Sequence, residues 1–426
     1  MPSAPPRFRR DVAIAIGAGV LGFVADYGKN VVLSRVLETH EFGDYRVGRA
    51  FAVFCGALVL LGGDRAAPRV LAKPLTEARF GVVWEYLRFY GGIGLGVSGL
   101  IIAGVLTGGY FHRGTWDPAA HHAVSILALT IPFMAVGALS GRTLQSVGRT
   151  FYAAMPWRVG APALLLGVLL ADRALTGGVD LTEALWLSVL TVVFVALVHG
   201  GLARHHALGA VASDPEARAP RTWLTLSVPM MGVFLVTKGL GDSDLYFLEW
   251  LGDEAAVGHY AAAITTAHVL LLVQTSVVAL YAPLLGRGAR AGEVRAGPVL
   301  REGGRIMALV QVPVVVGLAL AAPLVLSLFG PTYPDAAPVL RWIALGNGAW
   351  ALAALHALWL QYEGRGATVV AVALATLAVD SLLNLLLIPR FGPVGAAASS
   401  AATSIAAAAA IGWIAHRLRT AGAPTS

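Results

Sequence analysis

Apolar runs of about 18 residues or more recur along the whole chain, separated by short polar breaks. A run of this length crosses the hydrocarbon core of a bilayer as a single α-helix. We therefore predict an all-α polytopic membrane protein with about 12 transmembrane helices. The predicted spans are residues 11–37, 47–64, 82–108, 121–141, 155–172, 183–203, 222–249, 257–285, 305–329, 336–360, 366–388 and 394–416.

The composition agrees with a membrane protein. Of the 426 residues, 57% are hydrophobic and 13% are charged, whereas soluble domains carry about 25% charged residues. A net charge of +7 would suggest a nucleic-acid partner in a soluble protein. Here we attribute it to the Lys and Arg residues of cytoplasmic loops and expect no nucleic-acid binding. Cys55 is the only cysteine, which excludes a disulfide within the chain.

The Lys and Arg residues concentrate in alternate connections between the predicted spans. The connections around residues 65–79 and 286–304 are the richest in these residues. Cytoplasmic loops carry this excess in membrane proteins. The pattern predicts that both termini are cytoplasmic.

The chain repeats weakly at half its length. Glu41–Tyr45 opens the second span and Ala256–Tyr260 opens the eighth, 215 residues later, and the same offset aligns Lys29 with Asp244. We predict two pseudo-symmetric six-helix halves, residues 1–203 and 222–426, joined by a cytoplasmic linker at 204–221. Transporters built from parallel repeats bind cargo between their halves and work by alternating access.

Four motifs resemble polysaccharide exporters of the MATE/oligosaccharidyl-lipid (MOP) exporter superfamily. The matching stretches are Leu33–Leu37 with Glu41–Tyr45, Val257–Ala263, Leu328–Tyr333 and Asn384–Ala397, in the order that the family has them. The last is the most specific.

The resemblance implies a Wzx-like flippase, which is a transporter and not an enzyme. Such proteins move undecaprenyl-diphosphate-linked oligosaccharides from the inner to the outer leaflet of the bacterial cytoplasmic (inner) membrane. The implied partners are this substrate, membrane lipids and polysaccharide-assembly proteins, and neither a cofactor nor a metal is expected.

Charged residues inside the predicted spans mark the candidate site. The seventh span holds Lys238, Asp242 and Asp244, and each charge costs roughly 2.5–3.5 kcal/mol near the centre of a spanning helix. A helix facing lipid would not tolerate three of them. We therefore expect this segment to face other helices or a wet cavity.

The first span contributes a second charged group. Asp26, Lys29 and Asn30 share a helix face because they are three and four residues apart. We predict a cationic cavity that attracts the diphosphate and the sugar hydroxyls, since lysine acts as a point charge for phosphate. The predicted cavity residues are Lys29, Lys238, Arg35, Arg49 and Asn30.

Four carboxylates form the predicted ion-coupling group. Asp26, Asp242, Asp244 and Asp380 would titrate, or pair with the lysines when cargo is absent. The alternative is that these charges pair with one another and only hold the bundle together, which buried pairs do weakly.

Other polar residues receive structural interpretations. His268 and Asn347 lie in the middle of their spans, where a neighbouring helix can satisfy them. The small residues from Gly395 to Thr403 predict close helix packing and no cargo contact. Pro389 is expected to end the eleventh helix, with a turn at Gly392.

Two other functions stay open. A cation-coupled drug antiporter of the same superfamily would be expected to have an acidic, aromatic cavity, whereas this chain places lysines beside the acids. A membrane polymerase or ligase would need catalytic groups on a sizeable outside loop. The predicted outside loops are short, and no nucleophile elbow or metal-ligand spacing occurs.

Overall fold

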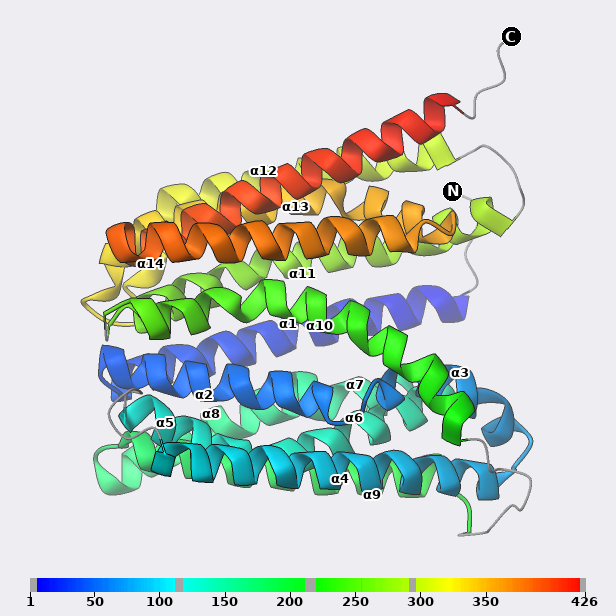
Figure 1. Ribbon diagram of the computed structural model, residues 1–426, viewed down its shortest axis with the longest axis horizontal. Helices are drawn as coiled ribbons and strands as arrows, with labels where there is room; N and C mark the ends of the chain where they lie inside the picture. The colour runs from blue at the N-terminus through cyan, green and yellow to red at the C-terminus, as the bar shows by residue number, and fades with distance from the viewer. Residues whose placement is uncertain (1–5, 112–117, 211–219, 254, 291–295, 422–426) are drawn as a thin grey trace. The chain divides into compact units, whose positions relative to one another are not determined.

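The computed structural model describes residues 6–111, 118–210, 220–253, 255–290 and 296–421, and it is built from helices throughout these ranges (Figure 1). Packing divides the chain into two compact units, residues 1–238 and 239–426. The division that the sequence predicts, with a linker at 204–221, stays a prediction.

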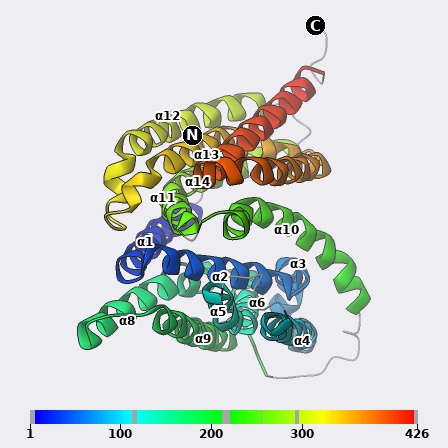
Figure 2. The same ribbon diagram turned by 60° about the vertical axis from the view of Figure 1, so that its left-hand side comes forward.

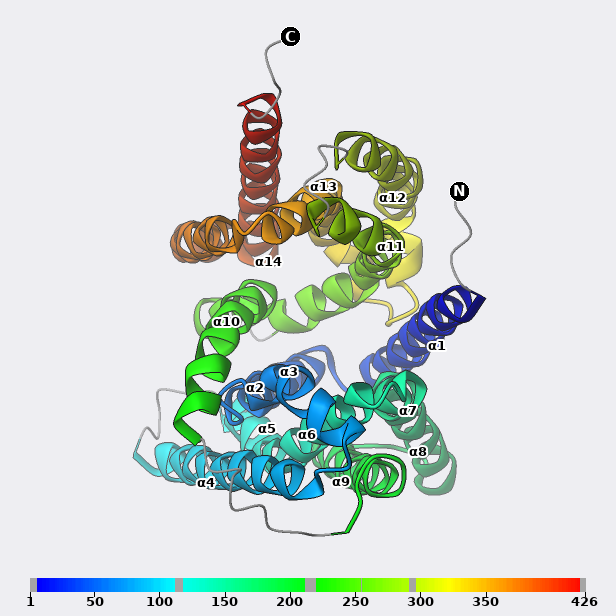
Figure 3. The ribbon, with the colours of Figure 1, turned by 90° about the vertical axis from the view of Figure 1, so that its right-hand side faces the viewer.

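The first unit contains the N-terminal helices and the start of α10. Their bounds are α1 (Pro6–Val36), α2 (Thr39–Leu58), α3 (Gly63–Thr76), α4 (Phe80–Phe111), α5 (Pro118–Ala128), α6 (Ile131–Ser146), α7 (Thr150–Met155), the π-helical turn η1 (Pro156–Gly160), α8 (Ala161–Thr176), α9 (Leu181–His206) and α10 (Pro220–Leu251). Helix α6 is central, because it packs against α2, α3, α4, α7 and α9. Figure 3 shows α6 among its neighbours.

The second unit contains the end of α10 and the four long helices that follow. These are α11 (Ala256–Arg290), α12 (Ala296–Leu326), α13 (Ala337–Tyr362) and α14 (Gly366–Ala421), with the short 3-10 turn η3 (Tyr333–Ala336) before α13. Helix α13 packs against α11, α12 and α14 and lies between α12 and α14 in Figure 2. Gly346 of α13 permits close approach, since a Cβ atom there would lie 2.8 Å from the Cα atom of Ala401.

The helices account for the predicted membrane spans. Within the described residues, seven helices are long and apolar enough to cross a membrane, or up to nine if each of two bent pairs is one span. The 55-residue α14 candidate contains a break, and α1 and α10 are each long enough to span but carry charged residues. The protein is therefore an all-α, multi-pass membrane protein, and the predicted count of about 12 spans is consistent with the helices.

Two predicted boundaries differ from the structure. The connection expected after residue 64 is helix α3, which bends from α2 by 41°. Leu61 and Gly62 interrupt the two helices with positive φ angles of 46° and 77°, a conformation that glycine adopts without steric cost. The span predicted at 121–141 is likewise two helices, α5 and α6, bent by 44°.

The expected helix end at Pro389 was wrong. Helix α14 runs through Pro389 to Gly392, where the backbone has φ 54° and ψ −137°. The chain turns back at this glycine, so the two arms of α14 point in different directions (Figures 1 and 3). A proline near a helix end removes only one hydrogen bond, whereas the φ of Gly392 is incompatible with a right-handed helix.

Capping residues define where two helices begin. The Asp180 carboxylate accepts a hydrogen bond of 2.7 Å from the Glu183 backbone N–H, and the Asp180 N–H donates to the Glu183 carboxylate at 3.1 Å. Glu38 and Glu41 form the same reciprocal arrangement before α2. Each capping box satisfies backbone donors that a helix start leaves without partners.

Candidate functional site

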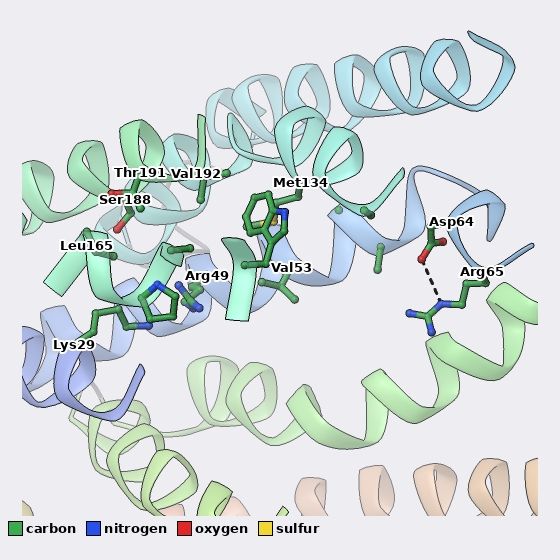
Figure 4. A pocket seen from close by; sticks show the side chains of 16 residues that line it. Lys29, Arg49, Val53, Asp64, Arg65, Met134, Leu165, Ser188, Thr191 and Val192 are labelled. Atoms are coloured by element: carbon green, nitrogen blue, oxygen red, sulfur yellow. Dashed lines mark ion pairs between the residues drawn. The ribbon is translucent and has the colours of Figure 1, made fainter. Parts of the chain in front are cut away.

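The first unit contains a pocket of about 310 Å³. Its lining residues come from α1, α2, α3, α6, η1, α8 and α9, so the site is assembled from most of the unit. Figure 4 shows Lys29 and Arg49 together at one end and the Asp64–Arg65 ion pair at the other. Its volume lies at the lower end of the usual range for small-molecule sites, about 300–1,000 Å³.

Lys29 is the most constrained charge in this pocket. Its side chain is fully buried, and its Nζ atom donates a hydrogen bond of 2.7 Å to Oδ1 of Asp26, one turn earlier in α1. The Arg49 guanidinium lies 3.6 Å from the same oxygen. One carboxylate therefore partners two cations, which come from two different helices.

Asn30 connects a third cation, Arg46, to Asp26. Its Nδ2 atom donates to the Asp26 carboxylate at 3.1 Å, and its Oδ1 atom accepts from Arg46 Nη1 at 3.1 Å. Lys29 and Arg49 thus share the carboxylate of Asp26, and Arg46 reaches it through Asn30, so in these ion pairs two cations face one carboxylate. We call these five residues the cationic cluster.

The second unit contains a pair of buried carboxylates. Asp244 is 4% exposed and Asp380 is 1% exposed. Asn384 Nδ2 connects them, donating to Asp244 Oδ1 at 2.7 Å and to Asp380 Oδ2 at 3.2 Å. The pair therefore joins α10 to α14.

Hydroxyl groups complete the coordination of Asp244. Its Oδ2 atom accepts hydrogen bonds from Ser400 Oγ at 2.5 Å and from the Tyr260 hydroxyl. Asp244 thus receives donors from α11 and from the second arm of α14.

Asp380 is held by the same arm of α14. Its Oδ1 atom accepts from Ser399 Oγ at 2.8 Å and from Thr403 Oγ1 at 3.3 Å. We call Asp244, Asp380, Asn384, Ser399, Ser400, Thr403 and Tyr260 the carboxylate cluster.

The charge of the carboxylate cluster differs from that of the cationic cluster. Among the described side chains, no lysine or arginine forms an ion pair with Asp244 or Asp380. Two carboxylates buried without a cation are costly, several kcal/mol each. The Asn384 Oδ1 atom is also buried and accepts no hydrogen bond. The arrangement suits a bound proton or a small cation, for which oxygen atoms are the ligands.

A smaller pocket of about 190 Å³ adjoins the carboxylate cluster. Asp244, Tyr260 and Ser400 line it together with His268, Gln274 and Asn347. His268 and Asn347 therefore lie at a polar pocket, although the sequence favoured structural roles for them.

The family is shown by comparison with known proteins. The model of the family described as "Polysaccharide biosynthesis protein" matches residues 8–287, more than half of the chain. The chain belongs to the polysaccharide biosynthesis protein family. No curated protein sequence matches it.

Solved structures share the fold of this polysaccharide biosynthesis family member. An inward-facing multidrug resistance MATE family transporter of the MOP superfamily has a TM-score of 0.76 at 14% identity, covering 96% of this chain and 98% of its own. The lipid II flippase MurJ in an inward closed conformation has a TM-score of 0.73 at 14% identity, covering 94% and 86%. A MOP superfamily transporter from Pyrococcus furiosus, with a binding pocket of reverse polarity, has a TM-score of 0.70 at 13% identity, covering 96% and 95%.

The sequence resemblance is thus confirmed at the level of the superfamily. The chain belongs to the polysaccharide biosynthesis protein family and has the fold of MOP superfamily transporters and of a lipid II flippase. Its transmembrane helices and its fold are those of this group.

Only some of the predicted site residues of this family member line the larger pocket. Lys29 and Arg49 line the larger pocket, and Asn30 supports them through Asp26. Arg35 is exposed in the last turn of α1 and does not line that pocket. Lys238 and Asp242 lie in α10, but their side chains fall outside the described residues.

Some lining residues of the two pockets match at the half-length offset that the sequence predicts. At the predicted offset of 215 residues, Lys29 corresponds to Asp244, Val53 to His268 and Gly56 to Leu271, and each of these residues lines its own pocket. The same position on the first helix of each half therefore carries a lysine in one unit and a carboxylate in the other.

Sequence reasoning missed several residues of both clusters. The small-residue run was assigned to packing alone, yet its hydroxyls hold both carboxylates. One sequence feature could have indicated this role. Ser399, Ser400 and Thr403 lie close together on one helix, shortly after the Asp380–Asn384 pair. Trp157 and Arg65 also line the larger pocket, although nothing in the sequence brought them to Lys29.

Proposed function

We propose that this protein flips a polyprenyl-diphosphate-linked oligosaccharide across the bacterial cytoplasmic membrane by alternating access, for surface polysaccharide biosynthesis. The observation that carries this proposal is the excess of positive charge at the larger pocket. Membership of the polysaccharide biosynthesis protein family supports the same cargo class.

The cationic cluster fits an anionic headgroup. Lys29 and Arg49 both line the pocket while sharing only one carboxylate, Asp26. A diphosphate entering the pocket would supply the negative charge that the cluster lacks. Arg49 offers a planar fork for phosphate oxygens, and Lys29 offers a compact point charge.

The carboxylate cluster supplies a coupling site in this proposal. Cargo movement against a gradient needs a second ligand whose binding differs between the two access states. A proton or a monovalent cation bound by Asp244 and Asp380 would be that ligand. The accompanying drop in buried negative charge would favour one packing of α10 against α14 over another.

The membrane orientation completes the proposal. With both termini in the cytoplasm, the Lys- and Arg-rich connections face inward, as positive-inside topology requires. Membrane lipids surround the exposed apolar side chains, and polysaccharide-assembly proteins would act before and after the flippase. The chain itself would carry out no bond-making step.

The proposal is tested in bacterial cells that lack this protein. The measured quantity is undecaprenyl-linked glycan on the cytoplasmic side, with wild type, Lys29→Ala, Arg49→Ala and Arg173→Ala supplied as complementing copies. Arg173 is exposed in the last turn of α8, so its variant is a charge-matched control. We expect glycan to accumulate without the protein, and wild type and Arg173→Ala to relieve the accumulation.

The variants Lys29→Ala and Arg49→Ala test the proposed binding site independently of the proposed function. Relief by Lys29→Ala and Arg49→Ala at wild-type levels would keep the flippase and reject the cationic cluster as its binding site. If no lipid-linked glycan accumulates in the deletion strain and surface polysaccharide is normal, the proposed function is wrong.

A cation-coupled drug antiporter is the second candidate. The observation that favours it is the smaller pocket, where Asp244 and Tyr260 combine negative charge with an aromatic ring. A cationic drug could be attracted there. Deletion would then lower the minimum inhibitory concentration of cationic compounds such as ethidium, and an unchanged value would exclude this candidate.

A further inference from the structure

Trp157 forms an aromatic wall of the larger pocket. It lies in the π-helical turn Pro156–Gly160, between the helical segments α7 and α8. Such turns widen a helix locally and often occur at functional sites. Pro156 lacks the N–H group that a regular α-helical turn would use here. The local sequence therefore favours the irregular turn that carries the indole.

The orientation of the indole is fixed by a buried partner. The Trp157 Nε1–H group donates a hydrogen bond of 2.8 Å to Nδ1 of His199 in α9, and His199 is fully buried. Because Nδ1 accepts, the proton of a neutral imidazole is on Nε2. His199 thus acts as a positioning residue for the ring of Trp157.

A glycine lets the ring pack closely against α6. A Cβ atom at Gly137 would lie 2.3 Å from a ring carbon of Trp157 and 2.5 Å from its Nε1 atom. Any side chain at this position would push the indole out of place. The ring is therefore clamped on two sides while part of it stays accessible to the pocket.

Trp157 lies farther along the pocket than the residues near Lys29. Trp157, Ala161 and Leu165 all line the pocket at four-residue intervals along one helix face. Leu165 lies near Lys29 in Figure 4. Trp157 is thus about two helical turns from the Lys29 end of the pocket, roughly 12 Å at 1.5 Å per residue.

We propose that Trp157 is a stacking platform for the first sugar ring attached to the diphosphate of the cargo. This inference rests on the proposed function and names a specificity-determining residue within it. A pyranose ring has an apolar C–H face that packs on an aromatic plane, and its hydroxyls stay available for polar groups. With the diphosphate at Lys29 and Arg49, the next group along the pocket is this sugar.

The charge of the pocket favours a sugar over an aromatic cation at the same indole. Arg65 is paired with Asp64, but Lys29 and Arg49 share one carboxylate, Asp26, so the positive charge in excess at that end of the pocket repels a positively charged ligand. A neutral sugar tethered to a diphosphate gains from both the cations and the ring. Trp157 therefore contacts the sugar, which is the group that distinguishes a glycosylated lipid carrier from the bare lipid carrier.

The test compares two defined lipids. Undecaprenyl diphosphate and undecaprenyl-diphosphate N-acetylglucosamine are titrated onto the purified full-length protein, and apparent dissociation constants are measured by native mass spectrometry. We expect wild type to bind the glycosylated lipid about tenfold more tightly. In Trp157→Ala this preference falls to about one, while binding of the bare lipid is unchanged.

Two further variants separate positioning from folding. Gly137→Ala displaces the ring and His199→Phe removes its hydrogen-bond acceptor, so both should lose the preference for the sugar and keep affinity for the bare lipid. A general folding defect would instead weaken the binding of both lipids. Trp186→Ala is the matched control, because Trp186 is 46% exposed on α9 and does not line the pocket.

The outcomes distinguish the two proposals. If wild type binds both lipids equally, or if Trp157→Ala keeps the preference, the platform is wrong and the flippase proposal stands. If wild type binds neither lipid, the proposed function fails, and this inference fails with it.

Discussion

The side-chain amide of Asn384 donates a hydrogen bond of 2.7 Å to Asp244, although the two residues are 140 positions apart in the sequence. The same amide also reaches Asp380, one turn earlier in α14. This contact ties the C-terminal part of α10 to α14 and places two carboxylates at one site. It gives the second unit an acidic centre, in contrast to the positive centre of the first.

Removing the charge of Asp244 should uncouple transport from its driving gradient. Asp244→Asn keeps the shape and a hydrogen-bond acceptor but removes the charge that would hold a proton or a cation. We expect the initial flipping rate in vesicles with an imposed pH or sodium gradient to fall about tenfold or more and to lose its gradient dependence. Glu363→Gln, which changes an exposed carboxylate, is the control. A variant that still follows the gradient would contradict the coupling role of Asp244.

The Asp26–Lys29 pair should show strong energetic coupling. Asp26→Asn leaves the fully buried Lys29 without its carboxylate, and breaking such a pair costs about 3 kcal/mol. The double variant Asp26→Asn with Lys29→Met removes both charges and should be more stable than Asp26→Asn alone. Thermal unfolding of the purified wild type, Asp26→Asn, Lys29→Met and the double variant in detergent measures the four stabilities. Strictly additive effects would show that the two side chains do not interact.

The left-handed turn between α2 and α3 should be intolerant of a side chain. Gly62 has φ 77°, and a Cβ atom there would lie 2.2 Å from the backbone oxygen of Ser227. Gly62→Ala should therefore cost more than the roughly 1 kcal/mol expected from backbone strain alone. Gly177 is a matched control, since it has φ 83° and open space around it. Equal melting temperatures for Gly62→Ala and Gly177→Ala would contradict the predicted clash.

Cysteine labelling can test the predicted membrane topology, in which both termini are cytoplasmic. Cys55 is buried and is the only cysteine, so Cys55→Ser supplies a background without reactive thiols. Glu38→Cys and Asp180→Cys should react with a membrane-impermeant maleimide in intact cells. Glu77→Cys and Glu363→Cys should react only after the membrane is opened. The reverse pattern would place both termini outside the cytoplasm.

Much of the fold could be predicted from local sequence patterns. Apolar runs of sufficient length dictate membrane-spanning helices, because a backbone in lipid must satisfy its own hydrogen bonds. The Asp180–Glu183 capping box and the Lys- and Arg-rich connections are equally local signals. Pro389 misled the prediction, since a proline disfavours a helix interior but does not dictate where the helix stops.

The candidate site could be predicted only in part. Lys29, Asp26 and Asn30 share one helix face, so helical periodicity alone brought them together. The same holds for Asp380 and Asn384. Charged residues in an apolar span are conspicuous, because each must be compensated.

Contacts between distant helices were decided by the tertiary structure. Trp157 meets His199, and Asp244 meets Asn384 and Ser400, through the packing of helices that no sequence spacing relates. Sequence alone determined which segments enter the membrane and which charges must be buried there, because hydrophobic transfer and backbone satisfaction act locally. Tertiary packing decided which side chains share a pocket and gave the cationic cluster and the carboxylate cluster opposite charge, because those contacts depend on how each helix is rotated and tilted against its neighbours.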